Sequence, residues 1–190
     1  GQSWTRTGQF EQQTAYYVVS NVQFITEQEG YVALNPLFDF DGLKIYRTTN
    51  GGQNWSLVYG PSDGNSWTSD FTSGLMIVGN YSPHGVLVST DGVNWQFRDG
   101  LSSYPRSAIS SNGRLVLTSQ TDFLYSDDIG NNWTTSDQSQ LTDDWLPGGC
   151  LTDCRLSGQG GNIYAVTGVS INYDSNPGIV RSLDNGTSWQ

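Results

Sequence analysis

One pattern of side chains recurs four times along this chain, and it constrains the fold more than any other feature of the sequence. A serine or threonine is followed by an acid or amide, then by glycine, then by tryptophan. The copies end at Trp55, Trp95, Trp133 and Trp189, so that successive tryptophans lie 40, 38 and 56 residues apart. A period of about 40 to 50 residues is typical of propeller blades and other repeat arrays.

Short apolar runs separate the copies. LMIVGN and GVLVST precede Trp95, for example, and RLVLTS and DFLYSD precede Trp133. Three such runs before each corner and one after it predict four antiparallel strands per repeat, because Gly, Asn, Pro and Asp break the runs. No window keeps apolar residues at helical spacing, so we expect essentially no helix. The predicted repeats cover approximately residues 5–55, 56–95, 96–133 and 134–189.

The recurring pattern has a physical explanation as a tight turn. The acid can accept hydrogen bonds from backbone N–H groups about two residues further on, and the glycine can adopt positive φ. The hydroxyl can tie the turn to the incoming strand, and the tryptophan can bury its ring while its N–H finds a partner. The pattern therefore predicts a self-capping hairpin at one corner of every repeat.

These corners resemble the Asp-box, or BNR, repeats of sialidase-like β-propellers, whose pattern is S/T-x-D-x-G-x-x-W. The copies at 126–133 and 182–189 match fully; the copy at 48–55 has Asn50 in place of Asp, and the copy at 89–95 is one residue short after Asp91-Gly92. The resemblance implies structural corners between the third and fourth strands, on the outer edge of each blade. The corner residues are Thr48, Asn50, Gly52 and Trp55; Ser89, Asp91, Gly92 and Trp95; Ser126, Asp128, Gly130 and Trp133; and Ser182, Asp184, Gly186 and Trp189.

The expected fold is therefore all-β: a β-propeller, or a segment of a larger propeller, with about four Asp-box blades of four antiparallel strands each. Residues 1–190 form a single domain or such a segment. The chain opens with GQSW, the second half of another copy. We expect residues 4–10 to form an outer strand.

Composition narrows the possible partners. The formal net charge is −10, with 18 acids against eight bases, and such a surface would repel nucleic-acid backbones. No apolar run approaches the roughly 20 residues that span a bilayer. We expect no cofactor and no metal site, since FDFDG at 38–42 lacks the further oxygen ligands of a calcium loop.

Candidates for catalysis lack partners. The pair Asp143 and Asp144 is weak evidence in a chain rich in Asp, and Tyr104-Pro105-Arg106 does not match the Arg-Ile-Pro motif that a sialidase would show. His84, between Pro83 and Gly85, is interpreted as a loop residue. The sequence thus favours a protein that is not an enzyme.

Location is inferred from two weaker signals. Cys150 and Cys154 are spaced for a local disulfide, which favours an oxidising compartment, although free thiols remain an alternative. Sequons for N-glycosylation occur at Asn54, Asn132 and Asn185, and a poorer one at Asn80. Together they favour an extracellular or cell-surface glycoprotein.

Three functions stay open. The first is a non-catalytic structural or adhesive module of a larger surface or filamentous assembly. The second is part of a sialidase-like or xyloglucanase-like glycoside hydrolase whose catalytic residues lie elsewhere. The third is a propeller that binds proteins or peptides, as sorting receptors and assembly factors do. The expected partners are other subunits or further blades, or glycans met through loops such as 168–178.

Overall fold

The computed structural model describes residues 17–36, 42–62, 66, 68–72, 74–119, 122–141, 155–167 and 178–190. The expected outer strand at 4–10, the FDFD acids, Asp143, Asp144, both cysteines and most of the 168–178 loop lie outside these residues.

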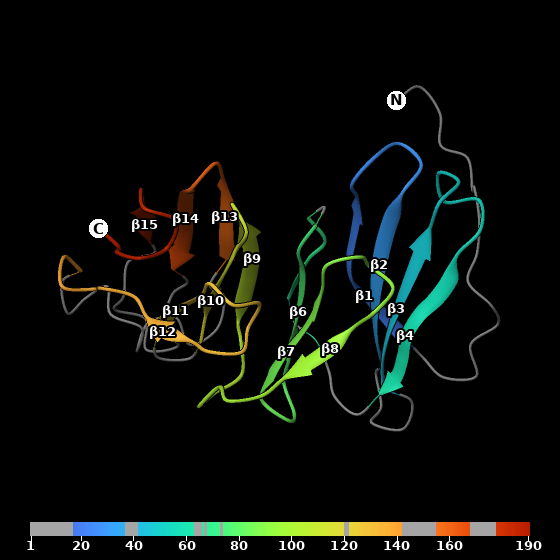
Figure 1. The fold of residues 1–190 in the computed structure, drawn as a ribbon, viewed down its shortest axis with the longest axis horizontal. Coiled ribbons are helices and arrows are strands. Elements are labelled where there is room, and N and C mark those ends of the chain that lie inside the picture. Colours follow the sequence, from blue (N-terminus) through green and yellow to red (C-terminus); the bar gives the residue numbers. More distant parts are fainter. Residues whose placement is uncertain are drawn as a thin grey trace.

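Among the described residues, strands form four antiparallel sheets in which neighbours follow sequence order (Figure 1). The first sheet contains β1 (Tyr17–Phe24), β2 (Gly30–Pro36), β3 (Leu43–Thr48) and β4 (Ser56–Ser62). The second contains β5 (Ser69–Asp70), β6 (Met76–Asn80), β7 (Gly85–Ser89) and β8 (Gln96–Arg98). The third contains β9 (Ser107–Ser111), β10 (Arg114–Thr118), β11 (Phe123–Ser126) and β12 (Thr134–Thr135). The fourth contains β13 (Arg155–Gln159), β14 (Asn162–Thr167) and β15 (Gly178–Ser182).

The prediction of an all-β propeller segment is confirmed, with one difference in detail. The described part of the fourth sheet has three strands, whereas we expected four per repeat. No helix in the described ranges is long and apolar enough to cross a membrane.

The middle strands of the second sheet read as apolar runs because a neighbouring sheet covers each of their faces, whereas the outer face of β2 is covered by side chains of the first sheet itself. Every described residue of β2, β6 and β7 is buried, while the outer strands β8 and β12 are mostly exposed. Consecutive side chains point to opposite faces of a strand. Val78 accordingly packs toward the first sheet, and its neighbour Ile77 packs toward the third.

Three apolar clusters join the four sheets in succession. Tyr31, Ala33, Leu43 and Ile45 of the first sheet meet Phe71, Met76, Val78 and Leu87 around the second. Ile77, Val86 and Val88 meet Leu101, Ala108, Leu115 and Leu117. Val116 and Phe123 meet Leu156, Ile163, Ala165 and Val180. The molecule is therefore an arc of stacked blades whose core lies between sheets, as in the repeat architectures that bury apolar surface only by stacking.

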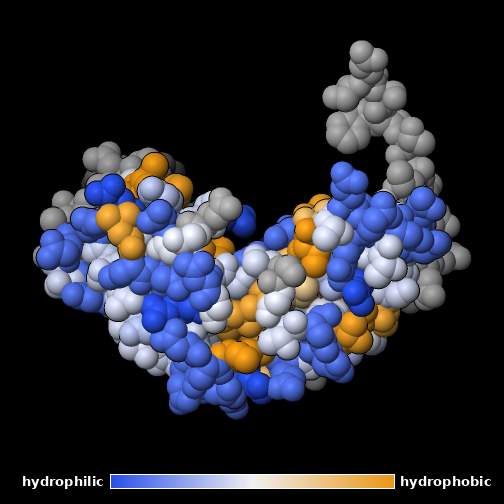
Figure 2. Space-filling model, turned by 45° about the horizontal axis from the view of Figure 1, so that its top comes forward, coloured by the Kyte–Doolittle hydropathy of each residue, from blue (hydrophilic) through white to orange (hydrophobic). Residues whose placement is uncertain are grey.

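The first strand of each sheet lies on the inner side of the arc. Strand β5 contacts β1 and β9, and β9 contacts β13, so β1, β5, β9 and β13 follow one another. The space-filling view shows the arc hollowed between its two ends (Figure 2). This arrangement places a concave surface on the inner strands and the repeated corners elsewhere.

Candidate functional site

The four corners share one hydrogen-bonded core. In each, the hydroxyl of the first residue accepts a hydrogen bond from the glycine N–H and contacts the acid or amide two residues after the hydroxyl. The distances from hydroxyl to glycine nitrogen are 3.0 Å for Thr48 and Gly52, 2.8 Å for Ser89 and Gly92, 2.9 Å for Ser126 and Gly130, and 2.7 Å for Ser182 and Gly186. All four hydroxyl residues are buried. Each hydroxyl thus pairs a buried donor that would otherwise cost free energy.

The acid or amide completes the turn. Asp128 Oδ1 accepts from Asn132 N at 2.9 Å, Asp184 Oδ1 from Ser188 N at 2.9 Å, and Asn50 Oδ1 from Asn54 N at 2.9 Å. The Asn50 corner therefore keeps the side-chain oxygen that accepts a backbone N–H, although this side chain carries no charge.

Hydrogen bonds lower the pKa of the corner carboxylates because they favour the charged form. For Asp128 the side chain and backbone of Asn132 are the main donors. For Asp184, burial raises the pKa, but the hydroxyl and N–H of Ser188 outweigh it, so the net shift is downward. For Asp91, the N–H and the side chain of Asn94 lead the donors that lower its pKa.

The short corner, at 89–95, has one residue fewer with positive φ than the three longer corners. In the longer corners two consecutive residues have positive φ: 66° and 84° at Gly51 and Gly52, 59° and 79° at Ile129 and Gly130, and 59° and 86° at Asn185 and Gly186. At 89–95 Gly92 alone does, with φ of 70°. The expectation that a residue is missing after Asp91-Gly92 is therefore corrected: the missing residue is the left-handed one between acid and glycine.

Each corner tryptophan belongs to a different apolar cluster. Trp95, Trp133 and Trp189 pack into the clusters between successive sheets, and Trp55 packs with Val32, Leu34 and Tyr46 on the other face of the first sheet. The ring of Trp189 stacks on Phe123 with centroids 4.2 Å apart. The expectation of a partner for the indole N–H is wrong at Trp95, Trp133 and Trp189, because their buried nitrogens face apolar surroundings and make no hydrogen bond.

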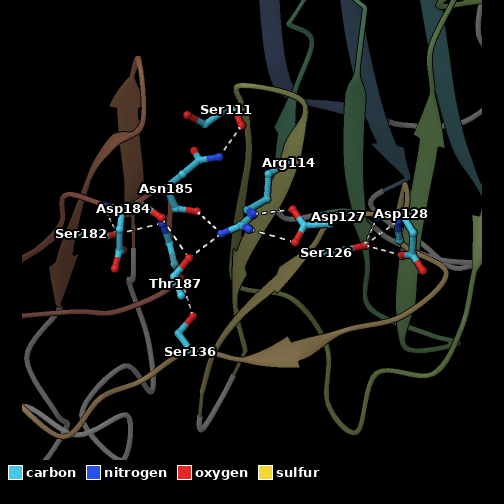
Figure 3. A network of polar contacts seen from close by, with 12 residues as sticks. Ser111, Arg114, Ser126, Asp127, Asp128, Ser136, Ser182, Asp184, Asn185 and Thr187 are labelled. Carbon is cyan, nitrogen blue, oxygen red and sulfur yellow. Dashed lines mark hydrogen bonds and ion pairs between the residues drawn. The ribbon is translucent and has the colours of Figure 1, made fainter.

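The corners also dock on the preceding sheet, which the sequence did not indicate. Figure 3 shows Arg114 of β10 between two corners. Its Nε and Nη2 donate to Asp127 at 2.6 and 2.9 Å, and its Nη1 donates to Asn185 O at 3.2 Å and Thr187 Oγ1 at 2.6 Å. Asn185 Nδ2 in turn donates to Ser111 O at 3.1 Å. The last corner is therefore part of the joint between the third and fourth sheets.

This docking bears on the sequons. Asn54 and Asn132 are exposed, but the Nδ2 of Asn132 donates to Asp128 at 2.6 Å. Asn185 is half-buried in the joint just described. A glycan on Asn185 would have to break that contact, so Asn54 is the most accessible of the three acceptors.

A second joint surrounds Gly92. A Cβ at this position would lie 2.0 Å from the Oη of Tyr31, a fully buried residue of the first sheet. Tyr31 Oη donates to Glu29 at 2.7 Å, and Arg47 pairs with the same carboxylate at 2.7 Å. Burial and the bond to Glu29 raise the pKa of Tyr31, and the bond from Tyr31 lowers the pKa of Glu29.

The inner side of the arc carries a hollow with a volume of about 390 Å³. The described residues that line it come from all four inner strands and their flanks: Ser20, Asn21, Gln23, Thr68, Ser69, Asp70, Thr72, Ser107, Ala108, Ile109, Ser110, Arg155, Leu156, Ser157 and Gly158. No corner residue is among them. A smaller hollow of about 190 Å³ lies against the first corner and includes Asn50 and Arg47.

The carboxylate of Asp70 lies at the centre of the hydrogen bonds that line the inner hollow. Asp70 was not among the candidate residues predicted from the sequence. Its Oδ2 accepts from Ser110 N at 2.7 Å and Ser110 Oγ at 3.2 Å. Its Oδ1 accepts from Gln23 Nε2 at 3.2 Å and Thr72 Oγ1 at 2.9 Å. One carboxylate therefore joins the inner strands of three consecutive sheets.

Further bonds stitch neighbouring inner strands. Thr68 Oγ1 accepts from Ala108 N at 2.9 Å, and one sheet later Ser107 Oγ accepts from Leu156 N at 2.9 Å. Asn21 Nδ2 donates to Ser69 O at 3.0 Å. These polar groups hold the wall of the hollow in place, and Arg155 and Ser157 are exposed beside them.

The hollow offers hydrogen bonds rather than a catalytic pair. Among the described residues that line it, Asp70 is the single carboxylate, and both of its oxygens are engaged. Glycoside hydrolysis by the usual routes needs two carboxyl groups across the scissile bond. No group of three or more potential metal ligands is present in the described segments.

Neither a family model nor a curated protein matches this chain. Several solved structures are similar to it. YCF48 bound to a D1 peptide is 16% identical with a TM-score of 0.53, over 95% of this chain and 82% of that one. An ancestral GH74 enzyme is 21% identical with a TM-score of 0.60, over 90% of this chain and 25% of that one. The sialidase of Trypanosoma rangeli is 16% identical with a TM-score of 0.56, over 92% of this chain and 36% of that one.

At these identities the likeness concerns the fold alone, which is that of a β-propeller. The chain spans about a quarter of the GH74 enzyme and about a third of the sialidase.

Proposed function

We propose that this chain is a binding module: a non-catalytic propeller segment whose inner hollow holds a stretch of polypeptide from a protein partner. The observation that carries this proposal is the lining of the hollow. It consists largely of hydroxyl and amide side chains, with one carboxylate whose oxygens are already paired.

A polypeptide fits such a lining well. Every residue of an extended peptide, proline excepted, offers one donor and one acceptor on its main chain. Serine and threonine hydroxyls both donate and accept, so they can follow a peptide without requiring particular side chains. No aromatic ring is among the described lining residues, so the hollow lacks the flat apolar platform against which a sugar ring could pack.

The similar structures agree with this choice without deciding it. YCF48, of which this chain spans 82%, is bound to a peptide, whereas the two hydrolases extend well beyond the region they share with this chain. The proposal includes a structural or adhesive role, because capture of a segment from a neighbouring subunit would assemble a larger surface structure.

We place this function outside the cell or at its surface. Support comes from the two cysteines and from the exposed sequon at Asn54. Expression through a secretory route should give a chain whose mass falls by one glycan in the variant N54Q. An unglycosylated secreted chain would remove this support.

The test of binding uses a display library of random short peptides and an array of glycans. Ser157 is exposed and lines the hollow, so S157Y should fill part of the space. Thr134, exposed on β12 away from the hollow, provides the matched control T134Y. Peptides selected on the native chain should lose at least about tenfold in affinity for S157Y and none for T134Y.

Two results would contradict the proposal. One is glycan binding that S157Y abolishes, with no enrichment of peptides. The other is turnover of a glycan by the native chain.

A further inference from the structure

A cluster of aromatic rings and one guanidinium lies beside the hollow and takes no part in the corners or in the inner-strand bonds. Its members, the rim cluster, are Tyr81, His84, Tyr104 and Arg106. Tyr81 and His84 lie between β6 and β7, and Tyr104 and Arg106 lie between β8 and β9. Two connections from neighbouring parts of the arc therefore meet here.

The rings of the rim cluster form a compact group. The centroid of Tyr104 is 4.5 Å from that of Tyr81 and 5.8 Å from that of His84, and Tyr81 and His84 are 6.4 Å apart. Tyr81 is 42% exposed although its ring contacts two others. Such a group offers apolar surface at a low cost in conformational entropy, since each ring has only two side-chain torsions.

Arg106 gives the cluster its charge. Its guanidinium carbon lies 4.5 Å from the centroid of Tyr104. Arg47 and Arg114 are held by the carboxylates of Glu29 and Asp127, but within the described segments no carboxylate pairs with Arg106. Its Nε is buried and donates to no acceptor.

A second unpaired atom lies in the same place. Asn80 is 3% exposed, and its Nδ2 donates to Pro83 O at 2.9 Å within the loop that carries Tyr81 and His84. Its Oδ1 has no partner. The residue that precedes Tyr81 thus has a buried oxygen without a hydrogen-bond partner.

The rim cluster adjoins the lining of the hollow along the chain. Arg106 directly precedes Ser107, and Gly79 N donates to Thr68 O at 2.9 Å; Ser107 and Thr68 both line the hollow. A Cβ on Gly79 would lie 2.7 Å from both Pro105 and Thr68, so Pro105, which separates Tyr104 from Arg106, packs close to this lining residue. The rim cluster therefore lies near the part of the hollow that Thr68 and Ser107 line.

We propose that the rim cluster is a specificity site for an acidic residue next to an apolar one in the polypeptide that the hollow binds. This inference rests on the proposed function and adds the chemistry of the ligand. The carboxylate pairs with the free guanidinium edge of Arg106, as arginine and carboxylate groups commonly do in two-pronged fashion. The neighbouring apolar side chain packs on Tyr81 and Tyr104.

The overall charge makes this site selective. The chain carries a formal net charge of −10, so its field disfavours anions in general. An acidic peptide therefore binds only where its short contacts with the guanidinium of Arg106 are stronger than the repulsion from the net negative charge of the chain. An acidic sugar could present the same carboxylate, and it serves below as a competing outcome.

The experiment compares two pools of fluorescent short peptides that are random except for a central Phe-Glu or Phe-Gln. The native chain should bind the Phe-Glu pool about tenfold more tightly. R106Q should remove this preference, so that it binds the two pools equally. Y81A should weaken both pools. The control R181Q, which removes an exposed arginine from β15, should keep the preference.

Each result has a defined meaning. Equal binding of both pools by the native chain, or a preference that survives R106Q, overturns the rim site. If S157Y still abolishes peptide binding in that case, the proposed function stands alone. If neither pool binds and sialyllactose binds in a manner lost in R106Q, both the peptide specificity and the proposed function are wrong. Thermal unfolding of each variant, expected to match the native chain, verifies that it is folded.

Discussion

The corners at 89–95 and 126–133 build the same turn from chains of different length. In the longer corner, Asp128 is followed by two residues with positive φ, Ile129 and Gly130. The Oδ1 of Asp128 accepts one hydrogen bond from the backbone, from Asn132 N at 2.9 Å. In the shorter one, Asp91 Oδ1 accepts two, from Val93 N at 2.9 Å and Asn94 N at 2.7 Å. Loss of one residue is thus met by concentrating the backbone donors on one oxygen.

The two corners also rest on different neighbours. A Cβ on Gly92 would meet the hydroxyl of Tyr31, which is buried and hydrogen-bonded to Glu29. A Cβ on Gly130 would lie 3.3 Å from the Cγ of Arg98, a half-buried side chain of β8. The comparison teaches that a glycine in this motif has two separate roles, one in backbone conformation and one in packing, and only the second differs between corners.

The largest expected effect comes from replacing each glycine by alanine. G130A should cost about 1–2 kcal/mol, because positive φ is unfavourable for any residue with a Cβ. G92A should cost about 3–5 kcal/mol, because the clash with Tyr31 adds an overpacking term. Urea unfolding of the two variants measures both values.

The variant Y31A separates the two roles of Gly92. A Cβ on Gly92 would lie 2.0 Å from Oη, 2.6 Å from Cζ and 2.8 Å from Cε1 of Tyr31, so the whole ring has to be removed to relieve the clash. In the Y31A background G92A should cost about 1–3 kcal/mol less than in the native chain, and the cost of G130A should not change. Equal costs for G92A and G130A would mean that the contact with Tyr31 does not matter.

A middle-sized effect is expected at the hydroxyls. S89A and S126A should each cost about 1–3 kcal/mol, because each leaves a buried glycine N–H without its acceptor. If the hydroxyl has the same role in the short and the long corner, the losses of unfolding free energy in S89A and S126A should agree within about 0.5 kcal/mol. S126T should restore most of the stability, since Thr48 serves the first corner in the same way. A large difference between S89A and S126A would show that the shorter turn holds its glycine N–H by other means.

The smallest effect concerns pH. Hydrogen bonds lower the pKa of Asp91 and Asp128 in the folded chain, with the N–H and side chain of Asn94 acting on Asp91 and the side chain and N–H of Asn132 acting on Asp128. A depressed pKa stabilises the folded state fully above the unfolded value of about 3.9, and this stabilisation is lost as the pH falls through the folded value.

D91N should therefore lower stability at neutral pH, and its difference in stability from the native chain should shrink as the pH falls below the unfolded value of about 3.9. D128N should behave alike. Urea midpoints across this range provide the measurement. Parallel curves at every pH would show that the charge of these carboxylates does not contribute.

Local features of the fold could be read from the sequence. Repeated sheets were predicted from the spacing of the tryptophans and from apolar runs such as LMIVGN and GVLVST. These strands could be predicted because an apolar run can be identified from its own residues, without knowledge of its partners in space. The turn hydroxyls and acids were recognisable for the same reason, since their partners lie within four residues.

Contacts between repeats could not be predicted in this way. Asp70 and Ser110 are 40 residues apart, and Arg114 and Thr187 are 73 apart, so no local pattern connects them. Asp70 stands in TSDFT, which looks like an ordinary polar strand end. One signal was available in the sequence. Thr68 directly precedes inner strand β5, and Ser107 is the first residue of inner strand β9. An alignment of the repeats would have placed these two hydroxyls at equivalent positions.

Ala108 N donates to Thr68 Oγ1 and Leu156 N donates to Ser107 Oγ, so both bonds run from a later backbone N–H to an earlier hydroxyl. During synthesis each of these hydroxyl acceptors leaves the ribosome before the N–H group that donates to it. Other joints have the opposite order, because Asn21 Nδ2 donates to the later Ser69 O. A circular permutant that makes the third sheet before the second would reverse the order in which Thr68 and Ala108 are made.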